Sequence, residues 1–227
     1  MTRASCPAAT GPPPGRESPV DVVFLDWGNT LMVDDGTQGG PMAIWTHVAA
    51  VPGAQQVLRS LRPRYRLIVA TNAADSDSDQ VRAALARVGL DDLIDGVVTS
   101  REVGACKPDP AFFRVALRAV FAGRPFSPRR AVMVGDSWEN DVAGAIAAGL
   151  RSVWFNPSGA GRPRGAPAPD AEIAELAQLA PALERLAQDV RVGPAESEQE
   201  AKPHHRRTAE RRAAGRDASV ARGRPPE

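Results

Sequence analysis

Apolar and polar positions follow two alternating patterns along this chain. Short, nearly continuous apolar runs, typical of buried parallel strands, lie near residues 21–26, 66–71, 96–99, 131–135 and 152–155. Between these runs, apolar residues recur three and four positions apart, which predicts helices near 53–62, 78–88, 110–120 and 138–148. Strands that alternate with helices predict an α/β fold, here a three-layer α/β/α sandwich around a mainly parallel, Rossmann-like sheet.

Two further helices are predicted toward the C-terminus. The helix after the fourth strand is expected to bear the apolar residues Val142, Ile146 and Ala147. Residues 157–169 are predicted to form a loop. Asp170 is then expected to cap a last amphipathic helix, whose apolar residues are Ile173, Leu176, Leu179, Leu183 and Leu186.

Composition divides the chain into three parts. Residues 1–19 are rich in Pro and Gly and are predicted to be a disordered leader. Residues 20–190 hold all the periodic segments and are long enough for one domain with its own core. Residues 191–227 lose the apolar periodicity and form a basic tail, also predicted to be disordered.

Charge and cysteine content narrow the classes of partner. The formal net charge is +1, so no global field favours nucleic acid or a membrane surface. The basic tail has no aromatic residue, which argues against base stacking. No apolar run approaches the roughly 20 residues of a membrane span. Cys6 and Cys106 show no metal-ligand spacing, and a reduced, cytoplasmic setting is expected.

Four polar motifs follow or flank the apolar runs in a fixed order. They are Asp26-Trp27-Gly28-Asn29-Thr30, Thr71-Asn72, Cys106-Lys107-Pro108, and Gly135-Asp136 with Asp141 five residues later. Three of them come directly after predicted strands, at the end where open α/β sheets bind their ligands. The basic residues are otherwise almost all Arg, so Lys107 indicates a need for a compact point charge.

Together these motifs resemble the haloacid dehalogenase-like hydrolases, in the subfamily whose last motif is Gly-Asp-x-x-x-x-Asp. The resemblance covers residues 20–190 and implies a phosphohydrolase that depends on Mg²⁺, a cation that prefers oxygen ligands. It implies that Asp26 attacks a phosphoester and forms an aspartyl phosphate.

The same resemblance implies roles for the remaining motif residues. Asp136 would bind Mg²⁺ directly, together with Asp26 and the carbonyl of Gly28, while Asp141 would act through a water molecule or orient Lys107. Thr71, Asn72 and Lys107 would hold the phosphoryl group.

Each motif residue also has a purely structural interpretation. Taken alone, Asp26 could cap a turn, Asp136 and Asp141 could cap the following helix, and Thr71 would be unremarkable. Lys107 could equally neutralise the carboxylates of the cleft. The ordered set of four motifs favours catalysis over these separate explanations.

Gly28 departs from the pattern of this family. Most of its phosphatases carry a second Asp two residues beyond the nucleophile, as the general acid and base. Such a group typically contributes 10²–10⁴-fold, so we expect slow turnover, a long-lived phosphoenzyme or a need for good leaving groups. Replacement candidates are His47 and the pair Asp34-Asp35. The alternative is a catalytically weakened module that binds phosphate or a protein partner.

The short insert after the first motif predicts that the cap domain of this family is missing. Only about twenty residues separate Leu31 from Val51. Phosphonatase and dehalogenase chemistry are disfavoured, because residues 31–66 contain no lysine and no segment could close an apolar pocket. An open cleft suits a large phosphorylated substrate, or a lid borrowed from another subunit of a homo-oligomer.

Overall fold

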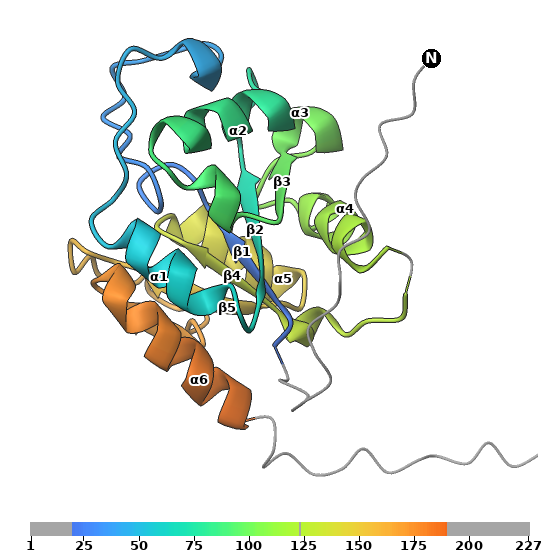
Figure 1. Ribbon diagram of the computed structural model, residues 1–227. Coiled ribbons are helices and arrows are strands. Elements are labelled where there is room, and N and C mark those ends of the chain that lie inside the picture. Colours follow the sequence, from blue (N-terminus) through green and yellow to red (C-terminus); the bar gives the residue numbers. More distant parts are fainter. Residues whose placement is uncertain (1–19, 123, 190–227) are drawn as a thin grey trace, which may run out of the picture. The chain divides into compact units, whose positions relative to one another are not determined.

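The computed structural model describes residues 20–122 and 124–189; the predicted leader and basic tail lie outside these ranges. The described chain contains one six-stranded sheet of order β3-β2-β1-β4-β5-β6, in which every neighbouring pair is parallel (Figure 1). The strands are β1 (Val22–Leu25), β2 (Arg66–Thr71), β3 (Gly96–Thr99), β4 (Ala131–Gly135), β5 (Arg151–Phe155) and β6 (Ala171–Ile173). The first five were predicted from their apolar runs; β6 was not.

The described helices follow the strands in the expected alternation. They are α1 (Ala54–Leu61), α2 (Ser78–Arg87), α3 (Ser100–Val103), α4 (Pro110–Phe121), α5 (Gly144–Ala147) and α6 (Leu179–Asp189). The 3₁₀ turns are η1 (Met42–Ile44), η2 (Asp91–Leu93), η3 (Pro128–Arg130) and η5 (Leu176–Gln178), and η4 (Trp138–Ala143) is a π-helical turn. Local signals set the starts: Asp77 and Gln80 form a capping box on α2, and Pro110 opens α4, where its missing N–H has no cost.

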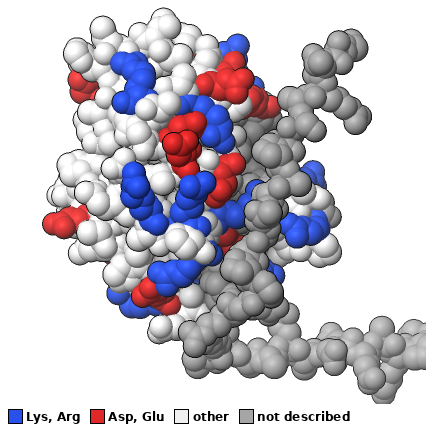
Figure 2. All heavy atoms as spheres, viewed as in Figure 1, with Lys and Arg blue, Asp and Glu red and all other residues white. Residues whose placement is uncertain are grey.

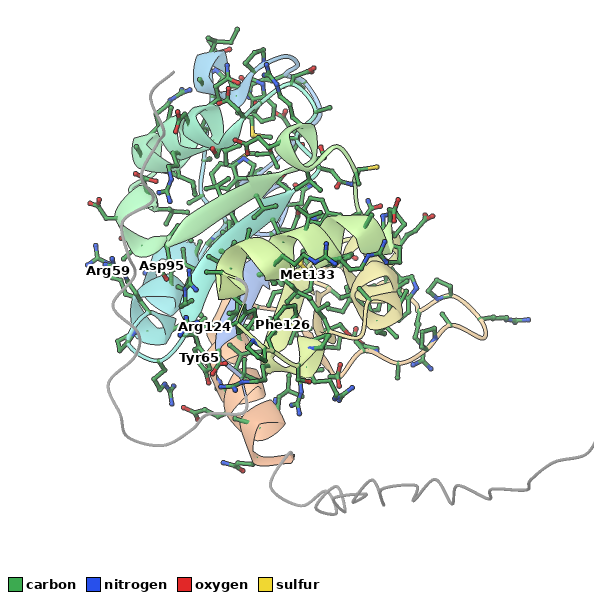
Figure 3. All side chains as sticks on the ribbon, turned by 90° about the vertical axis from the view of Figure 1, so that its right-hand side faces the viewer. Arg59, Tyr65, Asp95, Arg124, Phe126 and Met133 are labelled. Carbon is green, nitrogen blue, oxygen red and sulfur yellow. The ribbon has the colours of Figure 1, made fainter. Side chains whose placement is uncertain are left out.

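Two apolar layers cover the two faces of the sheet, as the predicted three-layer sandwich requires. In β1, Val23 and Leu25 pack into the layer that includes α1, α2 and α6, while Val22 and Phe24 pack into the layer that includes α4. Figure 3 looks onto the α4 side, where the fully buried Met133 of β4 lies beneath the helix. The α/β/α architecture is therefore confirmed.

The prediction that Asp170 caps the last helix was wrong. The Asp170 carboxylate accepts a hydrogen bond from the backbone N–H of Ser152 at 2.9 Å, and the next residues form β6 beside β5. Ile173 is buried on that strand, and α6 begins only at Leu179. The apolar spacing fitted a helical face, but the open edge of β5 offered backbone hydrogen bonds, and a strand satisfies them.

The insert after β1 folds without a cap domain. Among its described residues, 33–50 form one 3₁₀ turn, η1, and Ile44 on that turn is 76% exposed. Isolated bridges from Met32 to Gly28 and to Ala50 fold the insert back onto the end of β1.

The charged surface agrees with the near-neutral composition. On the face in Figure 2, basic and acidic side chains of the described residues are interspersed. No described helix has both the length and the apolar character needed to cross a bilayer.

Candidate active site

The predicted site residues meet at one edge of the sheet. Because β2, β1 and β4 are neighbours, their carboxyl ends bring three of the four motifs together. A cleft of about 260 Å³ opens there, and all seven predicted site residues line it: Asp26, Gly28, Thr71, Asn72, Lys107, Asp136 and Asp141.

Lys107 is the centre of the site. Its side chain is 2% exposed, and Nζ donates to Asp26 Oδ1 and Asp141 Oδ1, both at 2.6 Å, and to the Ala70 carbonyl at 2.8 Å. An ammonium has three donors, and all are used. Burial alone would lower the pKa of Lys107, but the charges of Asp26 and Asp141 outweigh it and raise that pKa above its ordinary value. Of the two roles expected for Lys107, phosphoryl binding and neutralisation of the cleft carboxylates, these contacts correspond to neutralisation.

Asn72 holds the segment that carries this lysine. Its amide Nδ2 donates to the Lys107 carbonyl at 2.9 Å, and its Oδ1 accepts from the Lys107 N–H at 2.8 Å. The side chain thus fixes the backbone of the third motif against the end of β2. Thr71, the last residue of β2, is buried and lines the cleft.

Asp141 is buried by an unusual turn. The turn η4 is π-helical, its N-cap residue Ser137 accepts from the Asn140 N–H, and the Ser137 N–H donates to Asp141 Oδ2 at 3.0 Å. Burial, opposed by the charge of Lys107 and assisted by that of Asp26, raises the pKa of Asp141 to about 7. π-Helical turns are frequent at functional sites.

Burial of this carboxylate also changes the inner face of the helix. Residues Asp141, Val142 and Ala145 are buried, whereas Ile146 is only partly buried and Ala147 is exposed. Of the three apolar residues expected on this helix, Val142 alone is buried, and Asp141 and Ala145 are buried beside it. A charged residue held by Lys107 occupies an inward position that apolar spacing cannot reveal.

Asp136 is positioned by two residues that the sequence did not single out as site residues. Thr30 Oγ1 donates to Asp136 Oδ1 at 3.2 Å and accepts from the Asp136 N–H at 3.1 Å. Trp154 Nε1 donates to the Asp136 carbonyl at 3.0 Å. Thr30 belongs to the first motif, which was a usable signal, whereas nothing near Trp154 in sequence points to this contact.

Three carboxylates share this edge with a single ammonium. One ligand atom from each of Asp26, Asp136 and Asp141 lies within 4.8 Å of the others. Burial raises the pKa of Asp136, and Asp26 raises it further, which reflects uncompensated negative charge. Clustered carboxylate oxygens suit a hard divalent cation, so these residues fit the Mg²⁺ that the resemblance implies.

Of the three replacement candidates for the missing acid–base group, the structure brings Asp34 into the cleft. A Cβ atom added to Gly28 would lie 3.6 Å from Asp34 Oδ2. Asp35 and His47 are exposed and do not line the cleft.

Gly135 is expected to tolerate no side chain. A Cβ there would lie 2.1 Å from Asp141 Oδ2, so Gly135→Ala must displace the carboxylate and its bonds to Ser137 and Lys107. We expect a loss of about 1–3 kcal/mol in the free energy of unfolding, measured by urea denaturation. Gly161→Ala is the matched control, because its Cβ would meet nothing within 4 Å. Equal stability of the two variants would contradict this packing.

Comparisons with known proteins point to one family. The model of one protein family, the haloacid dehalogenase-like hydrolases, matches residues 28–149. The pyrimidine 5'-nucleotidase YjjG of Escherichia coli is 35% identical over 158 residues, which are 69% of this chain and 67% of that protein. The ribulose-1,5-bisphosphate 5-phosphatase of Halopiger xanaduensis is 37% identical over 112 residues, 49% of this chain and 44% of that protein.

A solved structure extends the likeness to nearly the whole described fold. An uncharacterized protein from Listeria monocytogenes serotype 4b matches with a TM-score of 0.65 at 26% identity, over 74% of this chain and 99% of that chain. By contrast, the chain spans less than half the length of the Halopiger phosphatase.

Proposed function

Because the chain belongs to the haloacid dehalogenase-like hydrolases, we propose that it is a Mg²⁺-dependent phosphohydrolase that forms an aspartyl phosphate on Asp26. The observation that carries this proposal is the buried ammonium of Lys107, which joins Asp26 and Asp141 at 2.6 Å each, next to Asp136. A strand-end aspartate that merely capped a turn would need no such arrangement.

Asp26 is prepared for in-line attack. Lys107 binds Oδ1, which orients the carboxylate and leaves Oδ2 to bond to phosphorus as the ester P–O bond breaks. A water molecule then attacks the same phosphorus, the Asp26–phosphorus bond breaks, and inorganic phosphate leaves. Splitting the hydrolysis in this way replaces one difficult step by two easier ones.

The other cleft residues would hold the phosphoryl group and its cation. The Thr71 hydroxyl would donate to a phosphoryl oxygen, while Asn72 acts by holding Lys107. Asp26, Asp136 and the Gly28 carbonyl would bind Mg²⁺, with Asp141 acting through a water molecule or through Lys107. When bound, this cation neutralises the charge of the transferred phosphoryl group.

The open cleft indicates the class of substrate. Because the described insert forms one 3₁₀ turn and no cap domain over the cleft, a small phosphoester would remain exposed to water. We therefore propose a phosphomonoester of larger size, or a lid supplied by a second copy of the chain. The proposal places the enzyme in the cytoplasm.

A phosphate-release screen tests this function. Phosphate release from an aryl phosphate, nucleoside monophosphates and sugar phosphates should require Mg²⁺ and stop in EDTA. Beryllium fluoride with Mg²⁺ should also raise the melting temperature, because it mimics a phosphoryl group at Asp26. A shift in melting temperature without turnover of any ester would favour the weakened binding module that Gly28 suggests. If the protein showed no turnover and no shift, both functions would be rejected.

The stabilisation by Mg²⁺ is expected to grow as pH rises from about 4 to about 7. Asp141 has an ordinary pKa of 3.8 and a folded-state pKa of about 7, so across this window the metal-free folded protein binds more protons than the unfolded chain. The titration of Asp141 therefore lowers the free energy of unfolding of the metal-free protein as pH rises. A bound cation favours ionised carboxylates and removes this cost. Urea denaturation in EDTA and in Mg²⁺ across this pH range gives the two free energies of unfolding. If the gain from Mg²⁺ became smaller as pH rises, the proposed cation site at these carboxylates would be contradicted.

A further inference from the structure

The loop after the first motif brings a carboxylate to the position where Gly28 lacks one. Gly28 and Asp34 both line the cleft with Asp26 and Asp136. A Cβ built on Gly28 has Asp34 Oδ2 as its nearest neighbour, at 3.6 Å, and Asp34 Cβ next, at 3.8 Å. The Asp34 carboxylate therefore lies beside the space that a side chain at position 28 would enter.

The sequence between these residues fixes this placement. Asn29 has a φ of 53°, in the left-handed region that Asn tolerates better than most residues. Its side-chain Oδ1 accepts from the Asp34 N–H at 2.9 Å. The Asp34 Oδ1 atom in turn accepts from the Gly36 N–H at 2.9 Å. One carboxylate oxygen is thus held by the loop, and the other, Oδ2, faces Gly28.

The two other polar candidates of the insert, Asp35 and His47, do not line the cleft. Asp35 Oδ1 accepts from the Thr37 hydroxyl at 2.6 Å and from the Thr37 N–H at 3.0 Å. These bonds lower the pKa of Asp35 and make it a poor proton donor. His47 is exposed, and its backbone pairs with the side chain of Gln38.

We propose that Asp34 is the general acid and base of this enzyme and replaces the side chain that Gly28 lacks; this rests on the proposed phosphohydrolase function. In the first step Asp26 bonds to phosphorus, the ester P–O bond breaks, and the Asp34 carboxyl gives its proton to the departing oxygen. In the second, water attacks phosphorus, Asp34 takes the water proton, and the Asp26–phosphorus bond breaks. Phosphate and an alcohol are released, and both aspartates return to their starting states.

Leaving-group dependence tests this role. Asp34→Asn keeps the shape of the side chain and its Oδ1 acceptor, so the fold should persist. We expect it to lower kcat on an alkyl phosphate, a poor leaving group, by about 10²–10⁴-fold. On an activated aryl phosphate, whose leaving group needs no proton, the burst of phenol should persist while the later hydrolysis slows. Asp35→Asn is the matched control and should leave both rates close to wild type.

A second-site rescue separates a catalytic role from a structural one. Added to Asp34→Asn, Gly28→Asp should restore turnover of the alkyl phosphate, because its Cβ meets only ordinary contacts. Rescue would support Asp34 as a proton-transfer residue. If the wild type turned over both esters and Asp34→Asn did so at the same rates, the inference about Asp34 would be overturned and the proposed function would stand. A wild type inactive toward both esters would reject the proposed function, and the inference with it.

Discussion

Asp26→Asn is expected to abolish phosphoryl transfer while the protein stays folded. The amide is a far weaker nucleophile than the carboxylate, and loss of a catalytic nucleophile costs on the order of 10⁴–10⁶-fold in kcat. Asn has nearly the same volume as Asp, and Lys107 keeps its bonds to Asp141 and to the Ala70 carbonyl. The variant should therefore unfold cooperatively in urea, yet release no phosphate and form no phosphoenzyme.

Asp21→Asn provides the matched control. Asp21 lies just before the opposite end of the same strand, β1, and pairs with Arg130 on the surface at 2.6 Å. The same exchange at that position should leave turnover near the wild-type rate. If Asp26→Asn kept more than a small fraction of the activity, the nucleophile would have to be sought elsewhere.

Lys107→Met is expected to be the most destabilising of the proposed single substitutions. It leaves Asp26, Asp141 and the Ala70 carbonyl without their shared donor, in a region where Asp141 is 1% exposed. Removing one partner of a buried ion pair typically costs about 3–5 kcal/mol. Urea denaturation in EDTA, where no cation compensates, should show a loss of this size together with a loss of activity.

Two further variants show whether this loss of stability comes from buried carboxylates that have lost their cationic partner. Arg64→Met breaks the surface pair with Glu184, about half exposed on both sides, and should cost less than about 1 kcal/mol. Adding Asp141→Asn to Lys107→Met removes one stranded carboxylate and should recover part of the lost stability. Equal effects of Lys107→Met and Arg64→Met would contradict the central position of Lys107.

The sequence predicted the first five strands and the polar residues that follow them. Apolar runs indicated β1 and β4, and the family resemblance implied that Asp26 and Asp136 share one site; the structure adds that β1 and β4 are neighbours. Contacts that form when an irregular segment folds back onto the sheet could not be predicted from the sequence. Asp34 reaches Gly28 through the turn at Asn29, which left Asp34, Asp35 and His47 as equal candidates in the sequence. β6 depends on hydrogen bonds at the edge of β5, whereas its short sequence fits a helical pattern as well.

Trapping a phosphoenzyme in the wild-type protein tests the aspartyl phosphate on Asp26 most directly. The protein would be mixed with Mg²⁺ and an activated aryl phosphate, quenched in acid within the first turnover, and digested for mass spectrometry. We predict a phosphoryl group on the peptide that contains Asp26, matched by a stoichiometric burst of phenol and absent in EDTA. Steady phosphate release with no adduct on that peptide, or an adduct on another residue, would contradict the account.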